Sequence, residues 1–194
     1  EWTAELGRLG LYGGDHVATP LRAGDLVEIR ARYGLNYGGK RNINENHEIE
    51  PEYDFEVVPL VRGFGLPDAA ELVLADLKDA GNEFLFDPTR QTGGERYQAT
   101  LVKLTDLLVE DVQTWASDTD ILVSDGLGRD FTLHLCLNDS FNTMTPIVPG
   151  EIFDATGILD QSSSTGRDGY QLLVMNAEDI QLHSLDETVP EPVC

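Results

Sequence analysis

The amino-acid sequence predicts a mainly β protein built from two OB-type five-stranded β-barrels. Three observations favour this fold class: short apolar runs alternate with Gly, Asn, Asp and Pro, helix signals are sparse, and two landmarks recur in the same order. The expected strands are 26–32, 53–61, 98–104, 120–124, 130–137, 152–159 and 170–175. The best helix signal is 68–80, where Gly81 would end the helix, although the apolar run 71–74 also fits a strand followed by a turn.

The recurring landmarks indicate a duplicated module. Thr19–Ile29 parallels Thr145–Ala155, since each contains Thr-Pro, an apolar residue, a glycine followed by an acid, and then a strand. Tyr97-Gln98 and Tyr170-Gln171 form the second pair, and in each case an Asp stands nine residues after the Tyr. Two matches in the same order favour duplication over chance. In both copies we expect the glycine to permit a turn and the acid to accept main-chain N–H bonds.

The two copies differ in length because the first carries an insertion. Residues 1–108 are expected to form an OB-like domain whose opening strand is missing or shortened, which would make this chain a fragment. The insertion covers about 36–95 and would hold the short helix. Residues 109–187 form the compact second domain, with a hairpin turn at Ser124–Gly128. Residues 188–194 are a Pro-rich tail, expected to be extended because proline interrupts helix and strand pairing.

The charge of the chain is strongly acidic and unevenly distributed. Thirteen Lys and Arg stand against 35 Asp and Glu, a net charge of −22, and residues 1–104 hold 11 of the 13 basic residues. Such a surface repels polyanions, whose binding depends on cations. The composition is typical of a soluble extracellular surface, so we expect a secreted or cell-surface protein. No run of 18 apolar residues occurs, and we expect no membrane insertion.

Several motifs carry a resemblance to known proteins. They are Asp125–Arg129, Pro149–Glu151, Thr156–Gln161, Gly169–Leu172, Asn42–Asn44 and Phe86–Gln98. The first four resemble the OB-fold domains attached to exported bacterial nucleases and related secreted proteins. The last two resemble a variant of these domains in exported proteins of planctomycete-type bacteria. The resemblance covers most of the chain, and it implies tandem OB barrels in an exported protein.

The tail resembles a truncated sorting signal. Val189–Pro192 is similar to the start of a PEP-CTERM signal and directly follows the last expected strand region. In that family an apolar helix and a basic cluster come next, whereas this chain ends at Cys194. The resemblance implies that the tail is a linker toward such a segment. An ordinary frayed terminus is the alternative.

Signatures of catalysis and of metal binding are missing from the sequence. There is no Gly-x-Ser-x-Gly, Walker loop or His-Glu-x-x-His, and the four histidines lack metal-ligand spacing. Cys136 and Cys194 have no metal spacing either, and Cys136 is expected to be a buried thiol. We therefore expect no enzyme, no catalytic residue, no metal and no cofactor. Ca²⁺ is an open alternative, because 42–50 is rich in oxygen donors but lacks the spacing of a calcium loop.

Two sets of residues are candidates for binding. The first set combines a basic concentration with two tyrosines: Arg30, Arg32, Tyr33, Tyr37, Lys40 and Arg41. Its composition suits a nucleic-acid face that combines stacking with charge, and equally a solvated strand edge. The second set is a polar cluster: Asp87, Arg90, Glu95 and Arg96. It could hold a polar substrate, but we expect it to brace the insertion against the barrel through ion pairs.

These observations predict a non-catalytic, exported binding or structural module of tandem OB-like domains whose ligand is unknown. An OB face binds its ligand through strands and the loops beside them. Single-stranded nucleic acid and an extracellular polymer are the candidate partners. The alternative is an accessory domain that guides nucleic acid to the catalytic domain of a larger extracellular nuclease.

Overall fold

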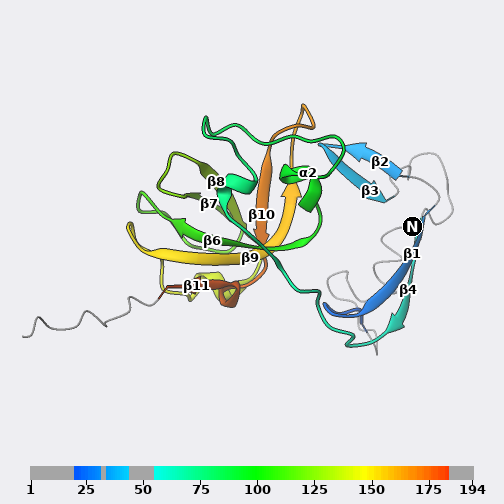
Figure 1. The fold of residues 1–194 in the computed structure, drawn as a ribbon. Coiled ribbons are helices and arrows are strands. Elements are labelled where there is room, and N and C mark those ends of the chain that lie inside the picture. Colours follow the sequence, from blue (N-terminus) through cyan, green and yellow to red (C-terminus); the bar gives the residue numbers. More distant parts are fainter. Residues whose placement is uncertain (1–19, 32–33, 44–54, 184–194) are drawn as a thin grey trace, which may run out of the picture. The chain divides into compact units, whose positions relative to one another are not determined.

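The computed structural model describes residues 20–31, 34–43 and 55–183, which are coloured in Figure 1. The chain divides into two units, Glu1–Asp68 and Ala69–Cys194. Strands predominate over helices in both units, and unit 2 contains a closed five-stranded barrel. The predicted mainly β class and OB-type barrel are therefore confirmed.

In unit 1 the described strands form two separate two-stranded sheets. β1 (Leu26–Ala31) pairs antiparallel with β4 (Phe55–Val61). β2 (Gly34–Tyr37) pairs antiparallel with β3 (Lys40–Ile43) in a tight hairpin. The two residues between β2 and β3, Gly38 and Gly39, have φ of +61° and +84°. Positive φ at both central positions is the requirement of a type I′ turn, so glycine is the residue type that suits this hairpin.

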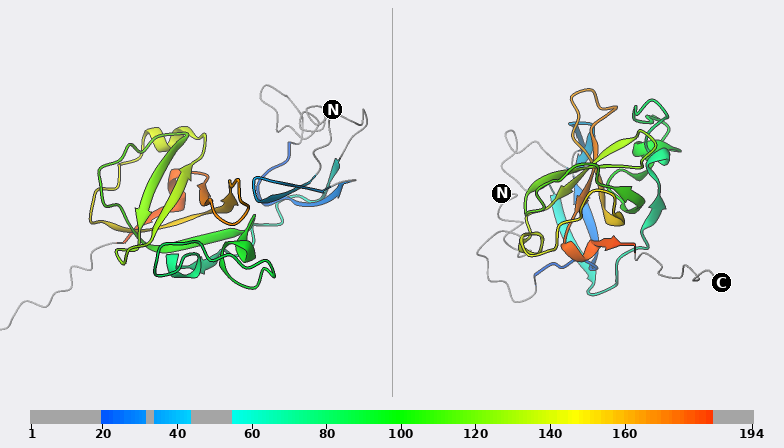
Figure 2. Two further views of the ribbon diagram at one scale, coloured as in Figure 1. Left: turned by 90° about the horizontal axis from the view of Figure 1, so that it is seen from above. Right: turned by 90° about the vertical axis from the view of Figure 1, so that its left-hand side faces the viewer.

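The barrel of unit 2 consists of β6 to β10 (Figures 1 and 2). These strands are β6 (Leu101–Leu108), β7 (Thr119–Ser124), β8 (Asp130–Leu135), β9 (Ile152–Gln161) and β10 (Tyr170–Val174). Their order around the barrel is β6-β7-β8-β10-β9, and β9 pairs with β6 to close the ring. All neighbours are antiparallel except β8 and β10, which are parallel. This is the strand order of an OB barrel, with β6 as its first strand.

Short elements extend the barrel sheet at both ends. β5 (Ala70–Leu72) pairs parallel with β6, and β11 (Ile180–Leu182) pairs antiparallel with β9. The helical segments are η1 (Leu74–Asp76), α2 (Gly93–Tyr97), η2 (Asp139–Asn142) and η3 (Ala177–Asp179). η2 lies between β8 and β9, and its Phe141 is fully buried in the core. It therefore helps to fill the barrel between two strands that are not neighbours.

Alternation along the strands builds one core in unit 2. β8 turns Phe131, Leu133 and Leu135 inward, and each is at most 2% exposed. Successive side chains of a strand point to opposite faces, so one apolar residue in two is enough to line the interior. Other fully buried members are Leu74, Leu77, Leu104, Leu107, Ile121, Phe141, Phe153, Leu159 and Leu172. They come from the other four barrel strands and from the segments beside them, so the barrel and its additions share one core.

The Gly-acid turn has the same structure in both copies of the first landmark. Gly24 and Gly150 have φ of +89° and +92°. Each following acid accepts a hydrogen bond from the main-chain N–H three residues earlier, at 3.0 Å for Asp25 and 2.9 Å for Glu151. The predicted role of this turn is confirmed: glycine supplies the positive φ and the acid fixes the main chain before a strand.

The second landmark does not mark equivalent strands. Tyr97 is the last residue of α2, whereas Tyr170 is the first residue of β10. The strand after Tyr97-Gln98, which the sequence interpretation assigns to the first domain, is β6, the first strand of the barrel in unit 2. The division after Asp68 therefore differs from the expected boundary at residue 108. A strand's apolar pattern shows that one face is buried but not which sheet it joins.

The remaining differences concern short elements. The region 68–80 contains β5 and η1, so the alternative of a strand followed by a turn is confirmed there. The sequence predicts no helix at α2, which lies after 68–80 and in unit 2. A second closed barrel stays a prediction, because the described part of unit 1 shows β1 to β4 only as two pairs.

We predict that Gly157→Ala will strongly destabilise unit 2. Gly157 lies in the middle of β9, and a Cβ there would stand 2.3 Å from the Leu173 carbonyl oxygen in β10. The two main chains would have to separate, at an expected cost of about 2 kcal/mol in the free energy of unfolding. Urea denaturation followed by Trp115 fluorescence measures this change. Gly81→Ala is the matched control, because its Cβ would meet only the Asp79 carboxylate at 3.3 Å. Equal stability of the two variants would contradict the close approach of β9 and β10.

Candidate binding site

OB barrels hold ligands on their second and third strands and on the loops next to them. In unit 2 these parts are β7, β8, the segment 109–118 before β7, and the segment 162–169 between β9 and β10. Two cavities of the described structure border these parts. The first lies between the segment 109–118 and β7, and we call it the β7 cavity.

The β7 cavity has a volume of about 230 Å³. Its lining residues are Glu110, Asp111, Gln113, Leu122, Val123, Ser124 and Asp130. They come from three places: the irregular segment after β6, the second half of β7, and the first residue of β8. The lining holds three carboxylates, and neither lysine nor arginine is part of it.

The Gln113 side chain forms one wall of the cavity and makes the hydrogen bonds that a neighbouring strand would make. The Gln113 carboxamide donates from Nε2 to the Leu122 carbonyl oxygen at 2.6 Å and accepts from the Leu122 N–H at Oε1 at 2.7 Å. A carboxamide carries the same donor and acceptor as a peptide group. Gln113 therefore occupies the edge of β7 in the way that one residue of a neighbouring strand would.

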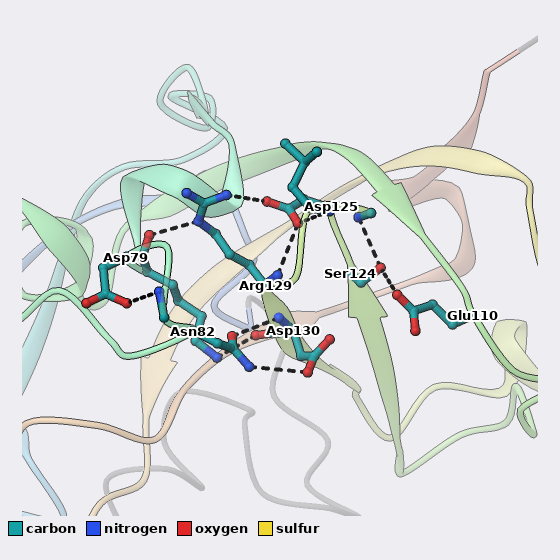
Figure 3. Close-up of polar contacts among 11 residues, drawn as sticks. Asp79, Asn82, Glu110, Ser124, Asp125, Arg129 and Asp130 are labelled. Carbon is teal, nitrogen blue, oxygen red and sulfur yellow. Dashed lines mark hydrogen bonds and ion pairs between the residues drawn. The ribbon is translucent and has the colours of Figure 1, made fainter.

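Glu110 is oriented by the end of β7. The Ser124 hydroxyl donates to Glu110 Oε1 at 2.7 Å, and Ser124 Oγ accepts from the Gly126 N–H at 3.2 Å. Ser124 is 1% exposed, so the hydroxyl is part of the wall and is closed to a reactant. Figure 3 shows this pair beside the hairpin that joins β7 to β8.

The hairpin itself is fixed by an ion pair inside the turn. Asp125 Oδ1 accepts from the main-chain N–H of Leu127 and Arg129, and Asp125 Oδ2 accepts from Arg129 Nη1 at 2.9 Å (Figure 3). Burial acts to raise the pKa of Asp125, and the hydrogen bonds from Leu127 and Arg129 outweigh it, so the pKa lies below its usual value. The guanidinium of Arg129 is therefore held at the turn, and its Nε donates to the Lys78 carbonyl oxygen at 3.1 Å.

Asp130 is held from outside the barrel by the segment 78–82. Asn82 Nδ2 donates to Asp130 Oδ2 at 3.2 Å, and Asn82 Oδ1 accepts from the Asp130 N–H at 2.9 Å (Figure 3). Lys78 Nζ donates to the Asp130 carbonyl oxygen at 2.6 Å and lies 4.5 Å from the centre of the Phe84 ring. Burial lowers the pKa of Lys78. The rim of the cavity at Asp130 is thus rigidly positioned.

The outer face of β7 and β8 next to the cavity is also acidic. His134 Nδ1 lies 2.8 Å from Asp120 Oδ1, and His134 Nε2 lies 3.8 Å from Asp118 Oδ1. The imidazole is half-buried, as its place in an alternating strand predicts. Cys136, just after β8, is a free thiol and is half-buried rather than buried, and burial raises its pKa.

The second cavity lies beside the segment 162–169. It is wider, about 670 Å³, and is lined by Glu83, Phe84, Phe86, Thr165, Arg167 and Asp168. The Arg167 guanidinium lies 5.5 Å from the centre of the Phe86 ring. Ser163 Oγ donates to Asp168 Oδ1 and accepts from the main-chain N–H of Thr165 and Gly166, which orders the loop. The guanidinium of Arg167 thus already makes a cation–π contact with Phe86 within the chain.

The Asp154 carboxylate stabilises a bulge in the pairing of β6 with β9. Asp154 on β9 accepts from Lys103 Nζ and His183 Nε2, both at 2.7 Å, and from the Asp106 N–H at 3.2 Å. Asp106 has φ of +58° where the pairing of β6 with β9 shifts register. The Asp154 carboxylate therefore satisfies a main-chain donor of the bulge. Neither cavity is lined by these residues.

The predicted basic set is only partly described. Arg30 lies on β1 and forms an ion pair with Glu28. Tyr37 stands opposite Lys40 in the β2–β3 register. Arg41 follows Lys40 on β3, and Arg32 and Tyr33 lie outside the described residues. The structure thus brings Tyr37, Lys40 and Arg41 into one hairpin and places Arg30 in the other sheet of unit 1.

The predicted polar cluster lies around α2 and makes contacts with the main chain. Arg90 Nε donates to the Glu95 carbonyl oxygen at 3.0 Å, and Arg96 Nη1 donates to the Gln91 carbonyl oxygen at 3.1 Å. Asp87 accepts hydrogen bonds from the residues that follow it in the loop. The sequence predicts that these residues brace the insertion through ion pairs. Within the described chain, the guanidinium groups of Arg90 and Arg96 donate to main-chain carbonyl oxygens.

Glu95 connects this segment to the barrel. Glu95 is 8% exposed, and its carboxylate accepts from the Tyr170 hydroxyl at 2.6 Å. Burial, and then the Glu95 carboxylate, raise the pKa of Tyr170. Gly94 allows this approach, because a Cβ there would stand 2.5 Å from the Tyr170 ring. Gln98 Nε2 adds a buried hydrogen bond to Gln161 Oε1 at 2.7 Å.

Sequence reasoning identified the hairpin 124–128 but not the cavity beside it. Gln113 and Asn82 give no sequence signal, because each acts on a residue across a loop or far along the chain. A usable signal was the acidic pair Glu110-Asp111 directly after a strand and before the hairpin. In an OB barrel this segment is the first loop, where ligands bind.

Comparisons with protein families, with curated proteins and with solved structures found no match. Among the helices of the described residues, none is long and apolar enough to cross a membrane. Within the same residues, no three or more His, Cys, Asp or Glu side chains are grouped so that they could hold a metal ion.

We predict that Asp87→Asn will reduce the acid sensitivity of unit 2. Hydrogen bonds from the Thr89 hydroxyl, and then from the main chain of Thr89, Gln91 and Thr92, lower the pKa of Asp87 to about 2. A carboxyl with a lowered pKa stabilises the fold above its unfolded value of 3.8, and this contribution is lost as the pH falls toward 2. Asn cannot titrate, so Tm should change less between about pH 4 and pH 2 in the variant than in the wild type.

Thermal unfolding across this pH range measures the effect, and Asp111→Asn removes the same charge from another loop of the unit as a control. A pH profile of Asp87→Asn identical to that of the wild type would show that ionisation of Asp87 adds nothing to stability.

Proposed function

We propose that this chain is a non-catalytic, exported binding or structural module whose OB-type barrel holds its ligand at the β7 cavity. The observation that carries the proposal is the position and lining of this cavity. It lies where OB barrels bind ligands, between the first loop and the second strand, and carboxylates and a carboxamide line it.

The lining favours a ligand rich in cationic or other hydrogen-bond donor groups. Carboxylates accept hydrogen bonds and attract cations, and they repel phosphate. Glu110 is held in place by a neutral partner, the Ser124 hydroxyl, so its negative charge is available to a ligand, whereas Asp130 also has the Lys78 ammonium beside it. An extracellular polymer that carries amino groups fits this cavity better than nucleic acid.

The state of the polar groups at the cavity supports a non-catalytic role. Nucleophilic catalysis requires an accessible hydroxyl or thiol beside a base. The only hydroxyl side chain of the lining belongs to Ser124, which is buried and bonded to the main chain of the hairpin. The lining includes no histidine and no cysteine. These residues suit binding better than chemistry.

Export is supported by the charge of −22 and by the resemblance of Val189–Pro192 to a sorting signal. Those four residues lie outside the described structure. The proposed location is therefore the cell surface or the medium.

The second candidate function is that of a nucleic-acid-guiding accessory domain, and one observation favours it. The β2–β3 hairpin contains Tyr37, Lys40 and Arg41, with Tyr37 opposite Lys40 in the register. Aromatic and basic residues on one hairpin suit a single strand of nucleic acid. In this proposal unit 1 would contact the nucleic acid, and the acidic barrel of unit 2 would not.

We predict that a short lysine peptide will bind at the β7 cavity and that oligo(dT) will not. Chemical-shift mapping of the ¹⁵N-labelled protein with acetyl-tetralysine amide should show its largest shifts in 110–113 and 122–124. The carboxylates of these segments attract the ammonium groups. Shifts spread evenly over all acidic loops, or equal shifts at the cavity with oligo(dT), would contradict the proposal.

The second candidate has its own test in a filter-binding assay with oligo(dT) at low salt. Replacing Arg30, Arg32, Lys40 and Arg41 with Glu should abolish any binding, because cations on phosphate supply most of the affinity. Replacing Arg30, Arg32 and Arg41 with Lys keeps the charge and should keep most of the affinity. Unchanged affinity in the Glu variant would show that this set does not bind nucleic acid.

A further inference from the structure

We propose that the edge of β7 is a pairing site for an extended basic peptide segment. The main chain of the peptide would replace the Gln113 carboxamide at Leu122, and a Lys or Arg side chain would enter the β7 cavity. This inference rests on the proposed function, since it names the partner class and the mode of binding at the same cavity.

Among the described residues, the main chain at this edge of β7 is hydrogen-bonded by a side chain instead of a strand. β6 pairs with β9 from Leu101 to Leu108 but meets β7 only through the pair of Leu108 and Ser124. The other edge of β6 is paired with β5. Within the described chain, the main chain of Leu122 is therefore bonded on this side by Gln113 instead of a strand.

The Gln113 contact can be exchanged without a loss of hydrogen bonds. A peptide group offers the same N–H and C=O as the carboxamide, so replacing one with the other keeps both bonds at Leu122. Gln113 lies in the irregular segment between β6 and β7, so its movement breaks no strand ladder. Pairing at a sheet edge supplies general affinity through the main chain, while pockets for alternate side chains supply selectivity.

The surroundings select the side chains of the partner. Glu110 and Asp111 border the cavity from the loop, and Asp130 borders it from the start of β8. Leu122 is 55% exposed and Val112 is 87% exposed, so apolar surface lies beside the carboxylates. Successive side chains of a strand point to opposite sides. A segment in which basic and apolar residues alternate would therefore place one type at the cavity and the other on the apolar surface.

The negative charge at this edge argues against a second copy of this chain and against nucleic acid as the partner. A second copy of this chain carries a net charge of −22, and a nucleic acid carries phosphate, so both are repelled by the three carboxylates. The remaining explanation is protective: Gln113 could block the edge to prevent aggregation. The two explanations differ in what happens when a suitable peptide is offered.

The test compares two labelled peptides by fluorescence anisotropy at physiological salt. The first is acetyl-Lys-Val-Lys-Val-Lys-Val-amide, and the second has the same sequence with N-methyl groups on the valines. Both have the same charge, but the second cannot donate from those residues to a strand edge. We expect the unmethylated peptide to bind about fivefold more tightly, since the N–H bond to the Leu122 carbonyl oxygen is lost on methylation and one hydrogen bond is worth about fivefold.

Variants assign the binding to the proposed edge. Glu110→Gln with Asp111→Asn should weaken the unmethylated peptide by about 25-fold, at roughly fivefold for each charge-assisted contact. The control, Glu71→Gln with Glu178→Gln, removes the same charge from elsewhere in unit 2 and should leave the affinity within about twofold. Gln113→Ala uncovers the edge and should retain or increase the affinity, and thermal unfolding checks that each variant is folded.

The outcomes separate this inference from the proposed function. Equal binding of the two peptides, sensitive to Glu110 and Asp111, would keep the cavity as a cation site and overturn the strand pairing. Absence of binding by both peptides, together with tetralysine shifts at the cavity, would also overturn the pairing alone. Failure of all three ligands would overturn both proposals and leave Gln113 as an edge block.

Discussion

Main-chain pairing between β6 and β9 closes the barrel, and most of the other features of unit 2 depend on it. β9 is ten residues long and is paired with β6, β10 and β11. Gly157 lets β10 approach where a side chain would collide, and the Asp154 carboxylate satisfies the bulge that β6 needs to follow β9. The core residues of β6 and β9 become buried only in the closed ring, so closure and core formation require each other.

Closure also determines where the candidate site lies. Because β6 is paired with β9 on one edge and with β5 on the other, it meets β7 at one residue pair only. The first loop then covers β7, with Gln113 on the strand edge and Glu110 bonded to Ser124. The cavity between them is a consequence of this incomplete pairing. Its acidity comes from the acidic loop and from Asp130 at the start of β8.

Local chemistry made much of the fold predictable, and non-local pairing limited the rest. The seven strands expected from alternation match β1, β4 and β6 to β10, and the Gly-acid turns at Gly24 and Gly150 follow from the residue types present. The sequence interpretation places the domain boundary at 108 and not after Asp68, because no local pattern shows that β6 pairs with β9. Likewise, no local pattern distinguishes Gln113 from an ordinary loop residue, because only the fold brings Leu122 beside it. The cluster around Glu95 was recognised as polar, but its partner Tyr170 lies 75 residues away.

Amide hydrogen exchange at the β6–β9 seam tests the account most directly. The amides of 102–104 and 155–158 should exchange only through global unfolding of unit 2, because 102–104 is paired with β5 and β9 and 155–158 is paired with β6. The Leu122 amide, held by the Gln113 side chain, should exchange faster through local opening. Fast exchange along β6 while the β7–β8 hairpin remains protected would contradict the account, since it would mean that β6 is a linker between domains and not the first strand of the barrel.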